Sequence, residues 1–146
     1  KWDVSKVTNM ENMFWNATAT IDGEDELSDS SIVKCIITQH NKIMYCARDF
    51  SSLQNINSSF APVRKILGIL GYSKEALLNY SGLHRTPLEI TQSIDQSRII
   101  ENDLELFSVQ FSAGFPGINE VREEKMVNEI LKTNNRQKEI LKKILY

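Results

Sequence analysis

The side chains in this sequence with the most potential for catalysis are two histidines and two cysteines. Their spacing matches no known catalytic motif. His40 lies in a turn-prone Gln-His-Asn segment and His84 in the loop before Thr86-Pro87, so we expect both in solvent-exposed loops. No Gly-x-Ser-x-Gly, His-Glu-x-x-His, P-loop or Rossmann glycine pattern occurs. The sequence therefore predicts no catalytic residue and no enzymatic activity within this chain.

The two cysteines fall in two β-branched and aromatic runs, residues 32–38 and 42–46, which indicate a hairpin. A two-residue turn at His40-Asn41 places Cys35 directly opposite Cys46, in a hydrogen-bonded pair whose backbone geometry suits a disulfide poorly. We therefore expect two reduced, packed thiols, and without a further Cys/His cluster no zinc site. The same register sets Ile36 opposite Tyr45 and Ile37 opposite Met44.

Charged side chains do not point to a metal, a cofactor or a nucleic acid. Residues 22–31 hold five carboxylates and no base, but they lack the EF-hand ligand spacing, so a solvated linker is expected over residues 21–31. Bases exceed acids in the second half of residues 118–146, which suits the C-terminal end of a helix. With 17 Lys and Arg against 19 Asp and Glu, the net charge of −2 gives no basic surface for nucleic acid.

Length and composition predict one domain. The chain has 146 residues, of which 41% are hydrophobic, enough for a single core. Its apolar stretches are far shorter than the roughly 18 residues of a membrane helix. Because the sequence begins at Lys1 rather than methionine, we expect a piece of a longer protein.

The pattern along the chain predicts an α+β fold with an antiparallel sheet. A helical zone is expected from Asp49 to about Tyr80, including a helix that starts at Pro62 and a short helix capped by Ser73. Further strands are expected over residues 88–94, 98–100 and 104–111. One core is expected to bury Ile37, Met44, Ile90, Phe107, Val109 and Phe111 against the first of these helices, at Val63, Ile66, Leu67 and Leu70.

The longest periodic segment, residues 118–146, predicts one long helix. A heptad places Val127, Asn134 and Leu141 at a positions and Glu123, Ile130, Gln137 and Ile144 at d positions. A polar a residue fixes register in two-stranded coiled coils, so a homodimer through residues 127–144 is one interpretation. The alternative is an amphipathic helix packed on its own domain, because a second apolar edge runs along the same segment.

Residues 2–14, Trp-Asp-Val-Ser-Lys-Val-Thr-Asn-Met-Glu-Asn-Met-Phe, resemble one unit of the BspA-type surface repeat proteins. That resemblance implies a cell-surface adhesive role. A solenoid needs at least about three units to bury a continuous core, and no second copy occurs. Residues 1–20 are therefore expected to be a terminal unit or a remnant.

Residues 31–146 resemble a PAS-type sensory domain followed by a signalling helix. The resemblance rests on the hairpin and on Leu70-Gly71-Tyr72-Ser73-Lys74-Glu75-Ala76-Leu77, which is similar to a recurring segment of that family. Residues 135–145 are also similar to the helix that precedes nucleotide-cyclase domains. The resemblance implies an effector domain beyond Tyr146.

Two function hypotheses follow from these resemblances. The first is a non-catalytic, cytoplasmic sensory domain, residues 32–117, that signals through a dimerising helix, residues 118–146. The second is a cell-surface adhesion fragment defined by the N-terminal unit. The sequence identifies no ligand, cofactor or cofactor-binding residue for either hypothesis.

Overall fold

The computed structural model describes residues 13–53, 62–112 and 121–145. The chain divides into two units, Lys1–Ala113 and Gly114–Tyr146. The first contains β1 (Phe14–Thr20), α1 (Asp25–Ser28), β2 (Lys34–Ile37), β3 (Ile43–Ala47), β4 (Val63–Tyr72), α2 (Lys74–Gly82), α3 (Pro87–Gln92), α4 (Gln96–Glu101) and β5 (Leu106–Gln110); the second contains α5 (Val121–Thr133) and α6 (Asn135–Leu145).

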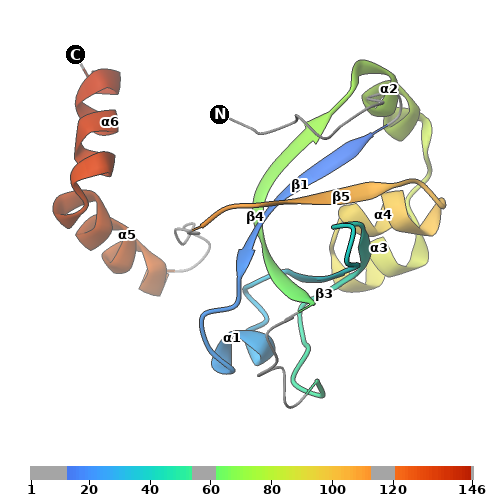
Figure 1. Ribbon diagram of the computed structural model, residues 1–146, viewed down its shortest axis with the longest axis horizontal. Helices are drawn as coiled ribbons and strands as arrows, with labels where there is room; N and C mark the ends of the chain where they lie inside the picture. The colour runs from blue at the N-terminus through green and yellow to red at the C-terminus, as the bar shows by residue number, and fades with distance from the viewer. Residues whose placement is uncertain (1–12, 54–61, 113–120, 146) are drawn as a thin grey trace. The chain divides into compact units, whose positions relative to one another are not determined.

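The first unit is built on a mixed five-stranded sheet in the order β3-β2-β4-β1-β5. The pairs β1/β4, β2/β3 and β2/β4 are antiparallel, whereas β1 and β5 are parallel, with Phe14 beside Leu106 and Asn16 beside Ser108. Figure 1 shows α1 and α2 at opposite ends of the long strand β4, and α3 and α4 side by side. The α+β class is confirmed, but the expected antiparallel, PAS-like sheet is wrong because of the parallel pair.

The β2–β3 hairpin agrees with the sequence except at one position. Cys35 lies opposite Cys46 and Ile36 opposite Tyr45, as predicted. Ile37 pairs with Ile43 instead of Met44, because the register shifts between Ile36 and Ile37. Both cysteines are free and buried.

The expected helix at Val63, Ile66, Leu67 and Leu70 is the strand β4. Asn16 pairs with Leu70 while Thr18 pairs with Ile66, so β4 carries two more residues than β1 over this stretch, which makes a bulge. Gly68, with φ of 71°, provides its left-handed conformation. Because of the bulge, Ile66 and Leu70, four residues apart, both pack against the main core. Apolar residues four apart are also typical of a helix, which explains the wrong prediction.

The strands expected over residues 88–94 and 98–100 are the helices α3 and α4. The Glu89 carboxylate accepts Thr86 N–H, one half of a capping box, and Pro87 lies in the first turn; together they start a helix regardless of the alternating apolar residues that follow. The helix expected near Phe50 is absent from the described part of that segment, which has only a turn at residues 51–52.

The main core lies between the sheet and the helices α2 and α4. Its buried residues are Phe14, Cys35, Ile37, Ile43, Cys46, Ala76, Ile94, Ile99 and Leu106. Strand β5 was predicted to bury the face of Phe107, Val109 and Phe111, but it buries Leu106 and Ser108 instead. Met44 and Ile90 are exposed, so they too were wrongly assigned to the core.

Residues 14–20, expected to belong to a repeat remnant, form β1 in the interior of the sheet. Phe14 is fully buried, and its ring makes edge contacts with Tyr72 and Tyr80 at centroid distances of 5.6 and 6.2 Å. The other part of that segment, residues 1–12, lies outside the described residues. Residues 14–20 are thus integral to the first unit's core.

Replacing Asn16 with Leu is expected to raise the free energy of unfolding by about 1–2 kcal/mol. Asn16 is fully buried, and neither amide atom of its side chain has a hydrogen-bond partner among the described residues. Thr18→Val on the same strand is the matched control and is expected to destabilise, because the Thr18 hydroxyl bonds that of Ser108 at 2.7 Å. Urea unfolding checks both, and a loss of stability in Asn16→Leu would mean that the amide has a partner in solution.

Two lysines attach the acidic stretch to the sheet. Lys65 pairs with Asp22 and Glu26, the latter at 2.8 Å. Lys34 is fully buried and donates to the backbone oxygens of Glu26 and Asp29 at 2.9 and 2.7 Å. Leu27 of α1 packs in a second small core with Ala47, Phe50 and Val63.

The second unit contains two helices instead of the single helix expected over residues 118–146. They meet at Asn134, whose side-chain oxygen accepts a hydrogen bond from Gln137 N–H at 3.1 Å and so starts α6. None of the helices in the described residues is long and apolar enough to cross a membrane.

The homodimer through residues 127–144 stays a prediction. If it forms, sedimentation of the chain should show a concentration-dependent dimer, and Asn134→Ile should change its oligomeric state because Asn at an a position limits the alignments of a seam. A concentration-independent monomer for both proteins would contradict it.

Candidate functional site

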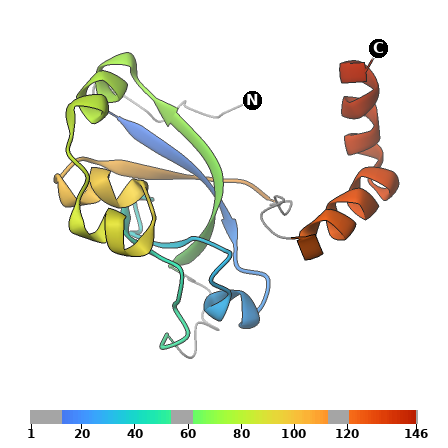
Figure 2. The same cartoon turned by 180° about the vertical axis from the view of Figure 1, so that it is seen from behind.

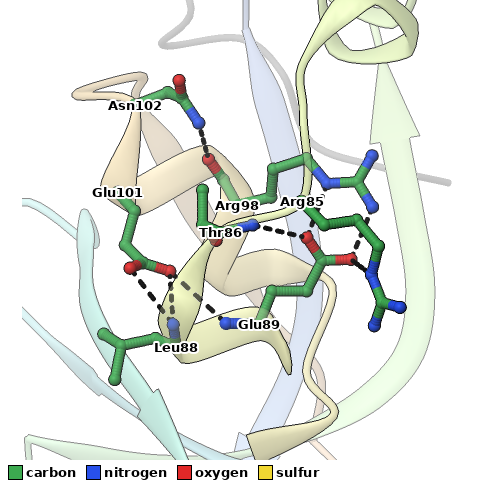
Figure 3. Close-up of polar contacts among 7 residues, drawn as sticks. All are labelled: Arg85, Thr86, Leu88, Glu89, Arg98, Glu101 and Asn102. Carbon is green, nitrogen blue, oxygen red and sulfur yellow. Dashed lines mark hydrogen bonds and ion pairs between the residues drawn. The ribbon is translucent and has the colours of Figure 1, made fainter. Parts of the chain in front are cut away.

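A group of charged side chains on α3, α4 and the loop before them surrounds Glu89. Its carboxylate, 4% exposed, lies between the guanidinium groups of Arg85 and Arg98 (Figure 3). Arg98 donates through Nε to Glu89 Oε2 at 2.7 Å and through Nη2 to Oε1, and Arg85 Nε donates to Oε1 at 3.1 Å. Thr86 N–H is the fourth donor, at 3.3 Å from Oε2.

The ends of two short helices position this cluster. Glu89 sits in the first turn of α3, where its carboxylate accepts the Thr86 N–H. Glu101 of α4 accepts the Leu88 N–H at 3.1 Å and so holds the start of α3 against α4. Figure 3 shows Asn102 closing α4 by donating to the Arg98 backbone oxygen, at 2.8 Å.

The side chains of Arg85, Glu89 and Arg98 together carry one net positive charge, and the Glu101 carboxylate lies beside them, 3.4 Å from Glu89 N. Hydrogen bonds from Arg98, followed by those from Thr86 and Arg85, outweigh burial and lower the pKa of Glu89 to about 2. The carboxylate is therefore ionised at neutral pH. With four donors on its two oxygens, it is not available as a general base.

The guanidinium groups have donors left for a ligand. Arg98 lies over the Tyr80 ring at 4.7 Å from its centroid, which fixes the guanidinium plane. Arg85 is 62% exposed, and its terminal nitrogens make no hydrogen bond to the described residues. A guanidinium held in this way suits a carboxylate or a phosphate, so the cluster can bind an anion.

The stability contributed by Glu89 should depend on pH in a defined window. Because its pKa is lowered from 4.5 to about 2, the contribution is complete above pH 4.5 and is lost as the pH falls towards 2. The difference in unfolding free energy between wild type and Glu89→Gln should therefore be constant from pH 7 to 5 and shrink between pH 4.5 and 2. Urea unfolding at these pH values measures it, and a difference that persists at pH 2 would contradict the ion-pair account.

The residues singled out from the sequence lie outside this cluster. His40 and His84 are exposed in loops, as predicted. Burial raises the pKa of the Cys35 thiol to about 12 and raises that of Cys46 as well, so neither is a nucleophile at neutral pH. In the described ranges no three His, Cys, Asp or Glu side chains gather to hold a metal ion.

Sequence reasoning missed Arg85, Glu89 and Arg98. A signal for the first two was present, because Thr86-Pro87-Leu88-Glu89 has the spacing of a capping box and Arg85 precedes Glu89 by one helical turn. Assigning residues 88–94 to a strand concealed it. The contact with Arg98 depends on how α3 and α4 pack, which the local sequence does not give.

Relatives with the same name match most of the chain, whereas no model of a protein family matches it. A 3-deoxy-manno-octulosonate cytidylyltransferase of Chlorobium phaeovibrioides is 23% identical over 115 residues, 79% of this chain and 47% of that protein. The proteins of that name from Zea mays and Protochlamydia amoebophila are 24% and 31% identical, over 86% and 54% of this chain and 42% and 31% of their own lengths. The chain thus spans less than half the length of these relatives.

The fold agrees with these matches. The solved structure of a CMP:2-keto-3-deoxy-manno-octonic acid synthetase complexed with CTP superposes with a TM-score of 0.70 at 22% identity, over 82% of this chain and 48% of that one. Most of this chain therefore has the fold of part of that synthetase.

These findings correct the functional expectations. The PAS-type and BspA-type resemblances are wrong, because the matching proteins and the matching fold are those of a cytidylyltransferase. The sensory, signalling and surface-adhesion roles that rested on them are therefore wrong as well. The expectation of no enzymatic activity within this chain is contradicted too, since its relatives carry an enzyme's name.

Proposed function

We propose that this chain is part of a cytidylyltransferase that joins CMP to an acidic sugar. The main support is the superposition of 82% of the chain on the structure of a synthetase complexed with CTP. The shared name of the curated relatives supports the same reaction class. Because the chain spans about half of these proteins, it contributes part of such an enzyme in this proposal.

The proposed reaction forms one phosphate ester and releases pyrophosphate. A hydroxyl oxygen of the sugar acid attacks the α-phosphorus of CTP, a new P–O bond forms, and the bond between the α-phosphorus and the bridging oxygen breaks. The hydroxyl loses its proton, and the bond electrons leave with pyrophosphate. Both reactants are anions, so the site needs fixed positive charge that does not titrate near neutral pH.

The cluster of Arg85, Glu89 and Arg98 can meet that need. Glu89 holds Arg98 in one orientation, and Arg85 presents unoccupied N–H donors at the surface. In this proposal Arg85 contacts the carboxylate of the sugar acid or a phosphate of the nucleotide. Arg98 holds the Glu89 carboxylate, which in turn orients Arg85. A location where CTP is available, inside the cell, belongs to the same proposal.

Calorimetric titration of the chain with 3-deoxy-manno-octulosonate, with CTP and Mg²⁺, and with neutral mannose tests the proposal. We expect at least one of the two anions to bind and mannose not to bind. Arg85→Met should weaken anion binding at least fivefold, whereas Lys74→Met, which removes another exposed positive charge, should leave it unchanged. Absence of binding by both anions at millimolar concentration would overturn the proposal, and unchanged binding in Arg85→Met would remove the role of Arg85.

A further inference from the structure

The two cysteines of the chain face each other across the β2–β3 hairpin. Cys35 is 0% exposed and Cys46 is 1% exposed, and both side chains belong to the main core. Burial is the main reason why the pKa of the Cys46 thiol is raised, and the neighbouring Cys35 raises it further. The two thiols are therefore close neighbours, and the proposed transfer reaction uses neither of them.

The backbone hydrogen bonds of β2 decide which kind of cross-strand pair the cysteines form. The Val33 oxygen and the Ile37 N–H each make a hydrogen bond of 2.8 Å on the β4 side of β2. Because the N–H and C=O of every second strand residue point to the same side, those of Cys35 also point towards β4, where it lies opposite Arg64. Cys35 and Cys46 therefore form a non-hydrogen-bonded pair.

This pair type differs from the one that a two-residue turn predicts. Thr38 N–H donates to Lys42 O at 2.8 Å, so residues 39–41 form the turn, and the register shifts between Ile36 and Ile37. The Cβ atoms of a non-hydrogen-bonded pair approach to about 4.5 Å, the upper end of the range of about 3.5–4.5 Å found in disulfides. The backbone geometry thus suits a bond between the two sulfurs.

We propose that Cys35 and Cys46 are a modification site, which a small-molecule disulfide such as oxidised glutathione converts into a cross-strand disulfide. The thiolate of one cysteine attacks a sulfur of oxidised glutathione, whose S–S bond breaks, and one glutathione thiolate leaves and takes up a proton. The other cysteine loses its proton, attacks the protein-bound sulfur of this mixed disulfide and releases the second glutathione. Two electrons pass from the cysteines to the reagent, which ends as two molecules of reduced glutathione.

The position of β3 gives the reagent access and gives the bond a consequence. Because β3 is the border strand of the sheet, its local opening exposes the thiols while the other strands stay paired. Figures 1 and 2 show β3 beside α4. Two residues after Cys46, Arg48 donates to the backbone oxygens of Gln92 and Ser93 at 3.1 and 3.3 Å, where α3 ends. The disulfide would therefore fix the strand that attaches the sheet to the helix of Glu89. This proposal does not depend on the proposed function.

Equilibration of the chain with reduced and oxidised glutathione, followed by acid quenching, alkylation and mass spectrometry, tests the proposal. The ratio of the oxidised and reduced chains gives the effective concentration of one thiol for the other. We expect a monomeric product lighter by two hydrogens. We also expect an effective concentration about 100-fold higher in the native chain than in concentrated guanidinium, because a disulfide that closes a loop of about twelve residues favours folding by about that factor.

The adjacent residues Ile36 and Tyr45 provide a matched pair, since they lie opposite each other on the same two strands. The variant Cys35→Ala, Cys46→Ala, Ile36→Cys, Tyr45→Cys moves the thiols to this hydrogen-bonded pair. Its effective concentration should be at least tenfold lower than that of the natural pair. Cys46→Ala alone is a smaller change, and its urea midpoint should stay the same in oxidised glutathione, whereas that of the wild type should rise.

Three results would overturn the proposal. The first is an effective concentration that is equal in the native and the denatured chain, or equal for the two cysteine pairs. The second is oxidation that yields only mixed disulfides with glutathione or disulfides between two chains. The third is a wild-type urea midpoint that oxidation leaves unchanged.

Discussion

Replacing Glu89 with Ala is expected to lower the free energy of unfolding by about 3 kcal/mol or more. The side chain of Arg98 is only 17% exposed, and without Glu89 its guanidinium would be left buried and unpaired. The Thr86 N–H would lose its acceptor as well, which weakens the start of α3. Urea or guanidinium unfolding at pH 7 measures the change.

An exposed ion pair provides the control for Glu89. Lys42 and Glu105 lie 3.2 Å apart with side chains 44% and 58% exposed, so Glu105→Ala should cost less than about 1 kcal/mol. Equal costs for the two substitutions would show that burial of the Arg85, Glu89 and Arg98 cluster is not what makes it stabilising.

Replacing Phe14 with Ala should cost about 3–5 kcal/mol, the range for removing a fully buried aromatic side chain. Phe14 lies in the interior strand β1 and packs against the rings of Tyr72 and Tyr80, on β4 and α2. Its loss would leave a cavity where these elements meet. The prediction tests directly whether residues 14–20 belong to the core of the first unit.

Leu77→Ala on the exposed side of α2 is the control for Phe14. That side chain is 49% exposed, so its truncation should change stability by less than about 1 kcal/mol. Thermal and urea unfolding measure both variants. A cost below 1 kcal/mol for Phe14→Ala would contradict the placement of β1.

The sequence predicts the fold well where local patterns act alone. The β2–β3 hairpin follows from two β-branched runs around a short turn, and α2 begins where Ser73 provides an N-cap, with its hydroxyl accepting Ala76 N–H at 3.1 Å. The strand β5 was also placed correctly, although its buried face was not. In each case neighbouring residues determine the structure.

Prediction fails where distant parts of the chain decide. The bulge at Gly68 gives β4 a helix-like spacing, and the parallel pairing of β1 with β5 joins segments about ninety residues apart. The resemblance of short segments to PAS-type domains gave a wrong function for the same reason, because a short segment does not determine which distant strands pair. The hairpin and the segment after Leu70 occur here in a sheet whose order no local motif specifies.

The candidate site was not predictable in full. Arg85 and Glu89 are linked by sequence spacing, but Arg98 joins them only because α4 packs beside α3. Arginine and glutamate are also common surface residues, and their types alone did not distinguish this trio from other charges. What distinguishes these three residues from other surface charges is the burial of Glu89, a property of the folded chain.

The most direct test of the central claim is a ¹H–¹⁵N NMR titration of the chain with 3-deoxy-manno-octulosonate and with CTP. If the chain is part of a cytidylyltransferase, at least one of these anions should shift resonances of Arg85, Glu89, Arg98 and Tyr80 in a saturable way. Spectra in which these four resonances do not change with either ligand up to 5 mM would contradict the claim.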